Sequence, residues 1–219
     1  MTQESDAVKT LSVVVLISGR GSNLQAIIEA QNRAQPGFKV CAVISNEPDA
    51  NGLALATQAG IPGYVVDHRT YSKRAAFDAA LLTCIDQQEP DLVVLAGFMR
   101  ILGQEFVSRY RGRMINIHPS LLPAFSGLDT HRRALEAGVR EHGASIHFVT
   151  ADLDGGPIIA QIKVPVNSSD NEAQLADRVL KGEHRLLPAV IEAIAQDRIR
   201  LDQEQVVVDG IPALFVQEN

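Results

Sequence analysis

Cysteine is scarce in this sequence, and its two copies stand far apart. Cys41 lies in an apolar run and Cys84 in a segment with helical spacing of its apolar residues. Neither has the Cys-x-x-Cys or Cys/His spacing of a metal or redox site. The scarcity excludes a disulfide-stapled scaffold and argues against a structural zinc ion. We therefore expect a reducing compartment, the cytoplasm, and no metal.

Long apolar runs and an excess of positive charge are also absent. No apolar stretch approaches the length of a membrane span, and the polar residues 1–10 lack the core of a signal peptide, so we expect them to form a disordered tail. The chain carries 20 Lys and Arg against 26 Asp and Glu, a formal net charge of −6. This balance argues against nucleic-acid or membrane partners and leaves room for a local pocket that binds a small anion.

Apolar runs alternate with segments of helical periodicity along the chain. Leu11–Ile17 is a continuous apolar run, typical of a strand buried on both faces of a parallel sheet. Strands that alternate with helices imply βαβ units. We therefore predict a single α/β domain over residues 11–219, with a Rossmann-like, mostly parallel twisted sheet flanked by helices. Antiparallel strands are added in its C-terminal part, and the end of the chain is expected to form a hairpin that turns at Asp209 and Gly210.

A glycine-rich turn follows the first predicted strand. Ser18-Gly19-Arg20-Gly21-Ser22-Asn23 leads into a helical pattern that begins at Leu24. Strand, glycine-rich turn and helix form a phosphate-binding arrangement, because glycines let the backbone approach an anion and the N–H groups of the helix start hold it. A simple tight turn and a dinucleotide site are the alternatives. The dinucleotide fingerprint requires a third glycine at the position that Leu24 occupies, which weakens the case for a dinucleotide site.

An amide and an imidazole stand two residues apart in the stretch Met114-Ile115-Asn116-Ile117-His118-Pro119. Side chains at i and i+2 of a strand point to the same side, so Asn116 and His118 are predicted to project together, preceded on that side by Met114. Their N–H groups suit a carbonyl oxygen that gains negative charge during acyl transfer. The alternative is that both are hydrogen-bonded structural residues ahead of a turn.

Two further segments could complete such a site. Gly97–Leu102 leaves the carboxyl end of a predicted strand, where open α/β sheets bind ligands. Its side chains could line a slot for a flat ring or pack in the core. Asp154 lies in a turn before Gly155-Gly156-Pro157. It could be an ordinary turn aspartate, or it could fix the tautomer of His118 and stabilise the imidazolium.

Four motifs in register resemble those of the phosphoribosylglycinamide formyltransferase family. They are Ile17-Ser18-Gly19-x-Gly21-Ser22-Asn23-Leu24-Gln25, Ala96-Gly97-Phe98-Met99-Arg100-Ile101-Leu102, Asn116-Ile117-His118-Pro119-Ser120-Leu121-Leu122-Pro123 and Leu153-Asp154-Gly155-Gly156-Pro157. The resemblance runs from about residue 11 to about residue 200. It implies an enzyme of purine biosynthesis and one-carbon metabolism that makes formylglycinamide ribonucleotide. The implied partners are the small molecules glycinamide ribonucleotide and 10-formyltetrahydrofolate, and the implied state is a monomer or homodimer.

The resemblance also implies roles for individual residues. The family's catalytic Asn, His and Asp match Asn116, His118 and Asp154. Binding of the ribonucleotide phosphate and amine falls to Gly21, Ser22, Asn23 and Glu183, and folate binding to Arg74, Phe98, Met99, Arg100, Ile101, Leu102, Met114 and Val149. These assignments divide the domain into a phosphate-binding half, about 11–110, and a catalytic and folate half, about 111–219. The segment Ala124-Phe125-Ser126-Gly127 replaces a more basic family pattern, which bears on the loop conformation and not on the reaction class.

Alternative functions differ in how much of the chain they use. A 10-formyltetrahydrofolate hydrolase would transfer formyl to water with the same triad, but the phosphate loop and the lack of an N-terminal regulatory domain argue against it. A tRNA formyltransferase would be expected to carry a further RNA-binding domain and more positive charge. A nucleotide-binding module or an NAD dehydrogenase would need only the first glycine turn, and leaves Asn116, His118 and Asp154 unexplained.

Overall fold

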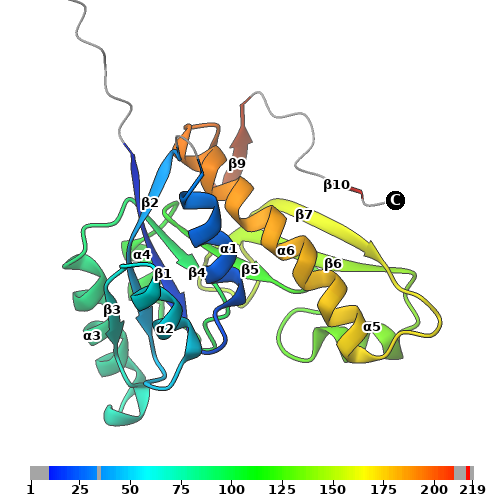
Figure 1. The fold of residues 1–219 in the computed structure, drawn as a ribbon, viewed down its shortest axis with the longest axis horizontal. Coiled ribbons are helices and arrows are strands. Elements are labelled where there is room, and N and C mark those ends of the chain that lie inside the picture. The colour runs from blue at the N-terminus through cyan, green and yellow to red at the C-terminus, as the bar shows by residue number, and fades with distance from the viewer. Residues whose placement is uncertain (1–9, 34–35, 210–215, 218–219) are drawn as a thin grey trace, which may run out of the picture.

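Eight strands form one mixed sheet that runs through the molecule (Figure 1). The computed structural model describes residues 10–33, 36–209 and 216–217. The strand order is β10-β7-β6-β5-β4-β1-β2-β3, and helices cover both faces of the sheet. The predicted α/β fold is therefore confirmed.

The elements alternate along the chain much as the apolar pattern predicts. In chain order they are β1 (Leu11–Ile17), α1 (Ser22–Gln31), β2 (Phe38–Ser45), α2 (Asn51–Gln58), β3 (Gly63–Val65), the 3-10 turn η1 (His68–Thr70), α3 (Arg74–Asp86), β4 (Leu92–Leu95), α4 (Gln104–Arg109), β5 (Met114–His118), α5 (Thr130–Glu136), β6 (Glu141–Phe148), β7 (Ile158–Pro165), α6 (Glu172–Ala195), β8 (Ile199–Asp202), β9 (Gln205–Val208) and β10 (Val216–Gln217). Strands β8 and β9 pair in a small sheet of their own.

The sheet has a parallel part and an antiparallel part that meet at β5. Strands β3, β2, β1, β4 and β5 run parallel to one another. Strand β6 is antiparallel to β5, and β7 is antiparallel to β6. The antiparallel strands predicted for the C-terminal part of the chain are therefore present, and β5 has a parallel neighbour on one side and an antiparallel neighbour on the other.

Two apolar cores lie on the two faces of the sheet. On β1, Val13, Val15 and Ile17 pack with helices α1, α2, α5 and α6 on one face, and Val14 and Leu16 pack with α3 and α4 on the other. All five side chains are fully buried. A strand covered on both faces has no polar side, which is why this segment is continuously apolar rather than alternating.

The strand order reverses between β1 and β4. The chain builds outward from β1 through β2 and β3, and then returns to the other side of β1 with β4 and β5. At the carboxyl ends of these two strands, the Ser18 N–H donates to the Gly97 carbonyl oxygen at 3.1 Å. Open α/β sheets bind ligands at such a reversal, because the connections leave in opposite directions and open a crevice.

The C-terminal segment contains a hairpin that precedes the predicted one. It turns at Gln203 and Glu204, because Asp202 pairs with Gln205, and it joins β8 to β9. Strand β10 joins the main sheet, parallel to β7. An apolar run indicates a strand but does not specify its partner, so the pairing of β9 with β8 cannot be read from the run alone. Of the predicted turn, Gly210 lies outside the described residues, as does most of the predicted N-terminal tail, residues 1–9.

Helix α6 crosses one face of the sheet and packs against β6, β7 and α1 (Figure 1). A capping box starts it, in which Asn171 Oδ1 accepts from the Gln174 N–H and Gln174 Oε1 accepts from the Asn171 N–H, both at 3.0 Å. Its apolar face, which includes Leu187, is buried, and Lys181 lies on its exposed face. None of the helices in the described ranges is long and apolar enough to cross a membrane.

Replacing Leu187 with Ala is expected to lower the free energy of unfolding by about 2–5 kcal/mol, because it removes a fully buried side chain and leaves a cavity. The matched control on the same helix is Lys181→Ala, whose side chain is 74% exposed and whose removal should change stability by less than about 0.5 kcal/mol. Urea unfolding followed by circular dichroism measures both. Equal losses in the two variants would contradict the packing of α6.

Candidate active site

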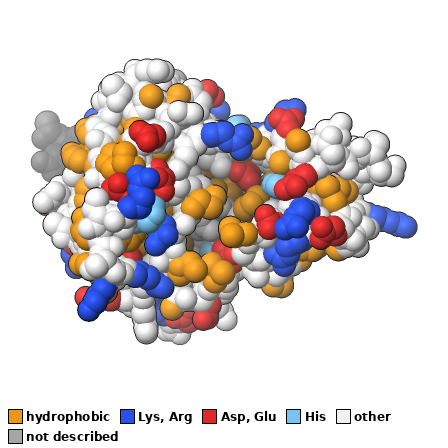
Figure 2. Space-filling view, turned by 90° about the horizontal axis from the view of Figure 1, so that it is seen from below, with side chains coloured by type: hydrophobic (Ala, Val, Ile, Leu, Met, Phe, Trp, Pro, Cys, Tyr) orange, Lys and Arg blue, Asp and Glu red, His pale blue; other side chains and the backbone are white. Residues whose placement is uncertain are grey.

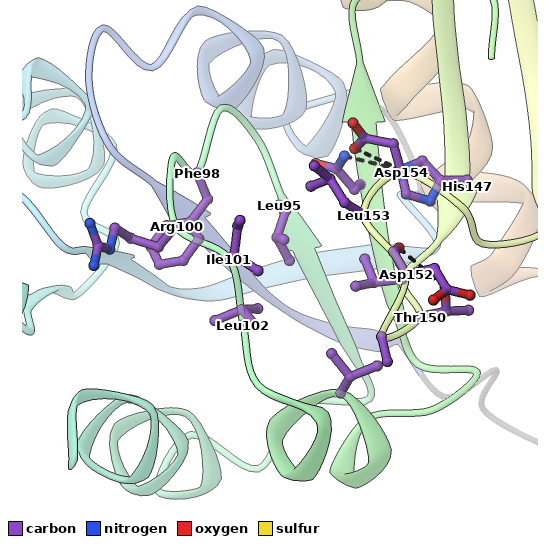
Figure 3. Close-up of a pocket in the computed structure, with 14 residues that line it drawn as sticks. Leu95, Phe98, Arg100, Ile101, Leu102, His147, Thr150, Asp152, Leu153 and Asp154 are labelled. Carbon is purple, nitrogen blue, oxygen red and sulfur yellow. Dashed lines mark hydrogen bonds and ion pairs between the residues drawn. The ribbon is translucent and has the colours of Figure 1, made fainter. Parts of the chain in front are cut away.

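A cavity of about 100 Å³ opens at the carboxyl ends of β4 and β5. One wall is the segment that leaves β4, and the facing wall is the loop between β6 and β7 (Figure 3). Hydrophobic side chains gather around a hollow on the face of the molecule seen in Figure 2. The lining residues combine apolar walls with a polar end; they are Leu95, Phe98, Arg100, Ile101, Leu102, Val107, Asn116, His147, Val149, Thr150, Ala151, Asp152, Leu153 and Asp154.

Asn116, His118 and Asp154 come together at the polar end of this cavity. Asn116 and Asp154 line it, and His118 Nδ1 lies 3.5 Å from Asp154 Oδ2. The His118 and Asp154 side chains are 8% and 9% exposed, so little water screens the interaction between them. Strand β5 supplies the first two residues, and the turn after β6 supplies the carboxylate.

The loop that follows β5 holds this polar group from another side. His118 Nε2 lies 3.1 Å from the Phe125 carbonyl oxygen, and the Gly127 N–H donates to Asp154 Oδ2 at 2.8 Å. His118 therefore faces an oxygen acceptor at each ring nitrogen, an arrangement that the imidazolium form, with two N–H donors, satisfies. Phe125 and Asp154 both have left-handed backbone conformations, with φ of 55° and 53°. Such strain in residues other than glycine is typical of functional sites.

Arg133, on α5, binds the loop that carries Phe125 and Ser126. Its guanidinium lies 5.7 Å from the centroid of the Phe125 ring. Its Nη1–H group donates to the Ser126 carbonyl oxygen at 2.6 Å and to the Leu128 carbonyl oxygen at 3.2 Å. The segment 124–127, which lacks the basic residue of the family pattern, is therefore tied down by an arginine that lies further along the chain.

His147 is a residue of this site that the sequence pattern does not single out. Its Nε2 lies 3.1 Å from Asn116 Nδ2 and 3.9 Å from Asp154 Oδ1, and Figure 3 shows its ring beside Asp154. Burial lowers the pKa of His147, although the Phe148 carbonyl and Asp154 act in the opposite direction. Alternation along β6 puts Ser145 and His147 on one face, but the register against β5, which decides their neighbours, cannot be read from that pattern.

The glycine-rich turn lies at the start of α1. Gly21 caps the helix with φ of 76°, and a Cβ there would lie 2.7 Å from Gly52 Cα, which is too close for real atoms. Because the first N–H groups of a helix have no partner within it, the backbone around Ser22 and Asn23 suits an anion. The turn borders an open groove of about 540 Å³ lined by Ser18, Gly19, Arg20, Glu47, Asp49, Ala50, Asn51 and Met99.

Glu183 lies inside the protein beside this helix start, where it is 6% exposed. Its Oε2 accepts a hydrogen bond from Asn23 Nδ2 at 2.6 Å. Burial raises the pKa of Glu183, and the hydrogen bond from Asn23 offsets part of that rise. Asn23 Oδ1 is also buried and has no hydrogen-bond partner among the described residues. The pair therefore holds acceptor capacity that a ligand with N–H or O–H donors could satisfy.

Most of the predicted folate contacts line the cavity. Phe98, Arg100, Ile101 and Leu102 come from the segment after β4, and Val149 follows β6. Phe98 and Leu102 are buried, whereas Ile101 is 59% exposed. An apolar side chain this exposed at a cavity mouth is available to a ligand without any rearrangement of the core.

Three predicted folate residues lie elsewhere. Met99 borders the groove beside the glycine-rich turn, where its N–H donates to Ser18 Oγ at 2.7 Å. Met114 is fully buried in the core, because it lies two residues before Asn116 on β5 and so further from the carboxyl end of the strand, where the cavity opens. Arg74 borders a separate cavity of about 360 Å³, with its Nε 3.6 Å from Asp78 Oδ2. Met114 is not among the residues that line the cavity, and its role as a wall of the folate slot stays a prediction.

Comparisons with known proteins agree with one another. The profile of the family described as formyl transferase matches residues 11–191. Over 200 residues the chain is 51% identical to the phosphoribosylglycinamide formyltransferase of Escherichia coli (strain K12), which covers 91% of this chain and 94% of that protein. Over 198 residues it is 42% identical to the phosphoribosylglycinamide formyltransferase of Haemophilus influenzae, covering 90% and 93%. The solved structure of the phosphoribosylglycinamide formyltransferase from Coxiella burnetii matches with a TM-score of 0.89 and 49% identity, covering 93% and 96%.

Replacing Glu183 with Gln is expected to raise the free energy of unfolding near neutral pH, because the fold then no longer buries a carboxylate. The raised pKa of Glu183 means that the native state binds this proton more tightly than the unfolded chain does. Wild-type stability therefore falls as the pH rises above the ordinary value of 4.5 and through the raised pKa.

The gain from Glu183→Gln should accordingly be absent at about pH 4 and present at about pH 8, which urea unfolding at the two pH values measures. Glu29→Gln, at an exposed position of α1, is the control and should show no such pH-dependent gain. A gain of the same size at both pH values would mean that the burial of the charge is not its cause.

Proposed function

Because the chain belongs to the formyl transferase family, we propose that it transfers the formyl group of 10-formyltetrahydrofolate to the amine of glycinamide ribonucleotide. The products are formylglycinamide ribonucleotide and tetrahydrofolate. The observation that carries the proposal is the convergence of Asn116, His118 and Asp154 at one end of an apolar cavity. Acyl transfer needs N–H donors at the carbonyl oxygen and a group that moves a proton, and this convergence supplies both.

The cavity fits the ring system of a folate in its chemistry. Its walls include Phe98, Leu102 and Val149, which suit the faces of a flat heterocycle. Its other side carries carboxylates and a threonine, which suit the ring's polar edge. When bound, 10-formyltetrahydrofolate supplies the formyl group, and the polar end of the cavity is where Asn116 and Asp154 lie.

Asn116 and His118 act on the formyl oxygen. As the substrate amine attacks the formyl carbon, this oxygen gains negative charge, and the Asn116 Nδ2–H and a ring N–H of His118 stabilise it by donating hydrogen bonds. Since Nδ1 faces Asp154, the donor for this role is the His118 Nε2–H, which would exchange the Phe125 carbonyl that it faces in the free protein for the formyl oxygen. No covalent acyl-enzyme is required.

Asp154 supports the imidazolium and handles the proton. Its carboxylate lies beside His118 Nδ1 and is fixed in place by the Gly127 N–H. A carboxylate so placed stabilises a positive charge on the ring. Directly or through a water molecule, it moves a proton from the attacking amine to the nitrogen that loses the formyl group.

The other end of the substrate would be held at the start of α1. The N–H groups of Gly21, Ser22 and Asn23 receive the ribonucleotide phosphate, favoured by the positive end of the helix. Glu183, which accepts a hydrogen bond from Asn23, also accepts one from the substrate amine and helps to orient that amine. Anchoring the phosphate away from the reacting amine converts binding energy into alignment.

An absorbance assay distinguishes this function from hydrolysis of the formyl donor. The protein is mixed with 10-formyltetrahydrofolate, with and without glycinamide ribonucleotide, and the release of tetrahydrofolate is followed. We expect release only when the ribonucleotide is present. Release in buffer alone would instead support the hydrolase, which uses the same triad with water as the acceptor.

Asn116→Ala and Asp154→Asn are each expected to reduce kcat by about 100- to 1000-fold while both substrates still bind, because each variant removes a group that acts mainly in the transition state. Single-turnover kinetics and equilibrium binding measure the two effects separately. The matched control is Asp177→Asn, at an exposed position of α6, which should keep wild-type rates. Near-normal single-turnover rates in Asp154→Asn would refute the role given to that residue.

A further inference from the structure

The orientation of the Asn116 carboxamide decides whether it can stabilise the formyl oxygen. A carboxamide has an N–H₂ donor on one side and a carbonyl acceptor on the other, and a turn of 180° exchanges them. Only the N–H₂ side can stabilise an oxygen that gains negative charge. Some neighbour must therefore hold the group in the productive orientation, and His147 is the side chain that contacts its nitrogen, at 3.1 Å.

We infer that His147 is a positioning residue that fixes the Asn116 carboxamide with its Nδ2 turned toward the reacting carbonyl. The inference rests on the role proposed above for Asn116. The two residues stand directly opposite each other in the antiparallel pair of β5 and β6. Opposite residues of such a pair have their side chains close together on one face, so the contact is built into the strand register.

The ring of His147 has a defined tautomer. Its Nδ1 lies 2.9 Å from the Phe148 carbonyl oxygen, which can only accept, so Nδ1 carries the hydrogen. In the neutral ring Nε2 then has a free lone pair, and it accepts a hydrogen bond from Asn116 Nδ2. One hydrogen of the amide is thereby committed to His147, and the other is left for the formyl oxygen.

The reversed amide is disfavoured by the same geometry. It would place Asn116 Oδ1 against the lone pair of His147 Nε2, so that two acceptors would face each other beside a buried ring. A protonated His147 would have the opposite effect, because its Nε2–H would face the N–H₂ group and favour the reversed amide. Burial opposes that protonation, and so does the neighbouring His118, while Asp154 and the Phe148 carbonyl favour it.

Two substitutions separate the hydrogen bond from the packing. His147→Leu fills a similar volume without an acceptor, whereas His147→Gln can place an oxygen near the position of Nε2. We expect His147→Leu to lower kcat by about 10- to 100-fold with little change in KM, and His147→Gln to restore most of the loss. The loss in His147→Leu should not exceed that in Asn116→Ala, because His147 acts through Asn116. Wild-type kcat in His147→Leu, or an equal loss in both variants, would overturn the inference.

A double-mutant cycle tests that the effect passes through Asn116. In the Asn116→Ala background, His147→Leu should cause no further loss of kcat beyond about twofold, whereas a merely structural role would multiply the two losses. His142→Leu is the matched control, because His142 is another fully buried histidine of β6. Its effect should multiply with that of Asn116→Ala. Multiplicative losses for His147→Leu as well would contradict the inference.

Nitrogen-15 NMR of the free protein provides a readout that does not depend on the reaction. At neutral pH the ring of His147 is expected to show a protonated Nδ1 and an unprotonated Nε2, the less common neutral tautomer. A protonated Nε2 would overturn the inference even if the enzyme transfers formyl as proposed. Failure of the wild-type protein to transfer formyl would instead refute the proposed function, while the NMR result would still decide the tautomer.

Discussion

The antiparallel pairing of β5 with β6 is the constraint on which the site depends. Its register places Asn116 opposite His147 and His118 opposite Ser145. If β5 were shifted by one residue, Asn116 and His118 would both point away from the cavity, since side chains alternate between faces along a strand. Strand β5 is also parallel to β4 on its other edge, so its end is shared by the crevice of the parallel sheet and by the turn that carries Asp154.

The same pairing fixes the chain beyond His118. Ser145 Oγ–H donates to the Ser120 carbonyl oxygen at 2.6 Å, and Ser145 Oγ accepts from the Leu122 N–H at 3.0 Å. The loop that follows reaches Phe125, whose carbonyl contacts His118, and Gly127, whose N–H contacts Asp154. The scaffold thus positions the imidazole, its carboxylate and the surrounding backbone through one set of strand contacts, which is how rigid elements confer accuracy on a site.

Several features of the site lower the stability of the fold, and apolar burial in the core compensates for them. Glu183 is buried beside Asn23, whose Oδ1 has no hydrogen-bond partner in the part of the chain that the structure describes, and Phe125 and Asp154 have strained backbones. Each feature opposes folding. The apolar clusters on both faces of the sheet supply the stability that permits them.

Local patterns in the sequence predict the elements well and their partners less well. The apolar run Leu11–Ile17 and the two-residue spacing of Asn116 and His118 reflect strand geometry, which a short segment encodes by itself. The contact of His147 with Asn116 depends on the register between two strands, and the burial of Met114 depends on where along β5 the cavity opens. The partner of β9 likewise depends on which strands compete for it in the folded chain, and its pairing with β8 cannot be read from its own sequence.

The glycines at the start of α1 and in α2 have a consequence for how this turn can be changed. A Cβ on Gly21 would strike Gly52, and a Cβ on Gly52 would lie 2.4 Å from Ile17 Cδ1. The shape of the turn is therefore set jointly by β1 and α2 rather than by its own six residues. A chimaera that exchanges the turn between relatives would have to carry the whole segment from Ile17 to Gly52, because its parts are geometrically inseparable.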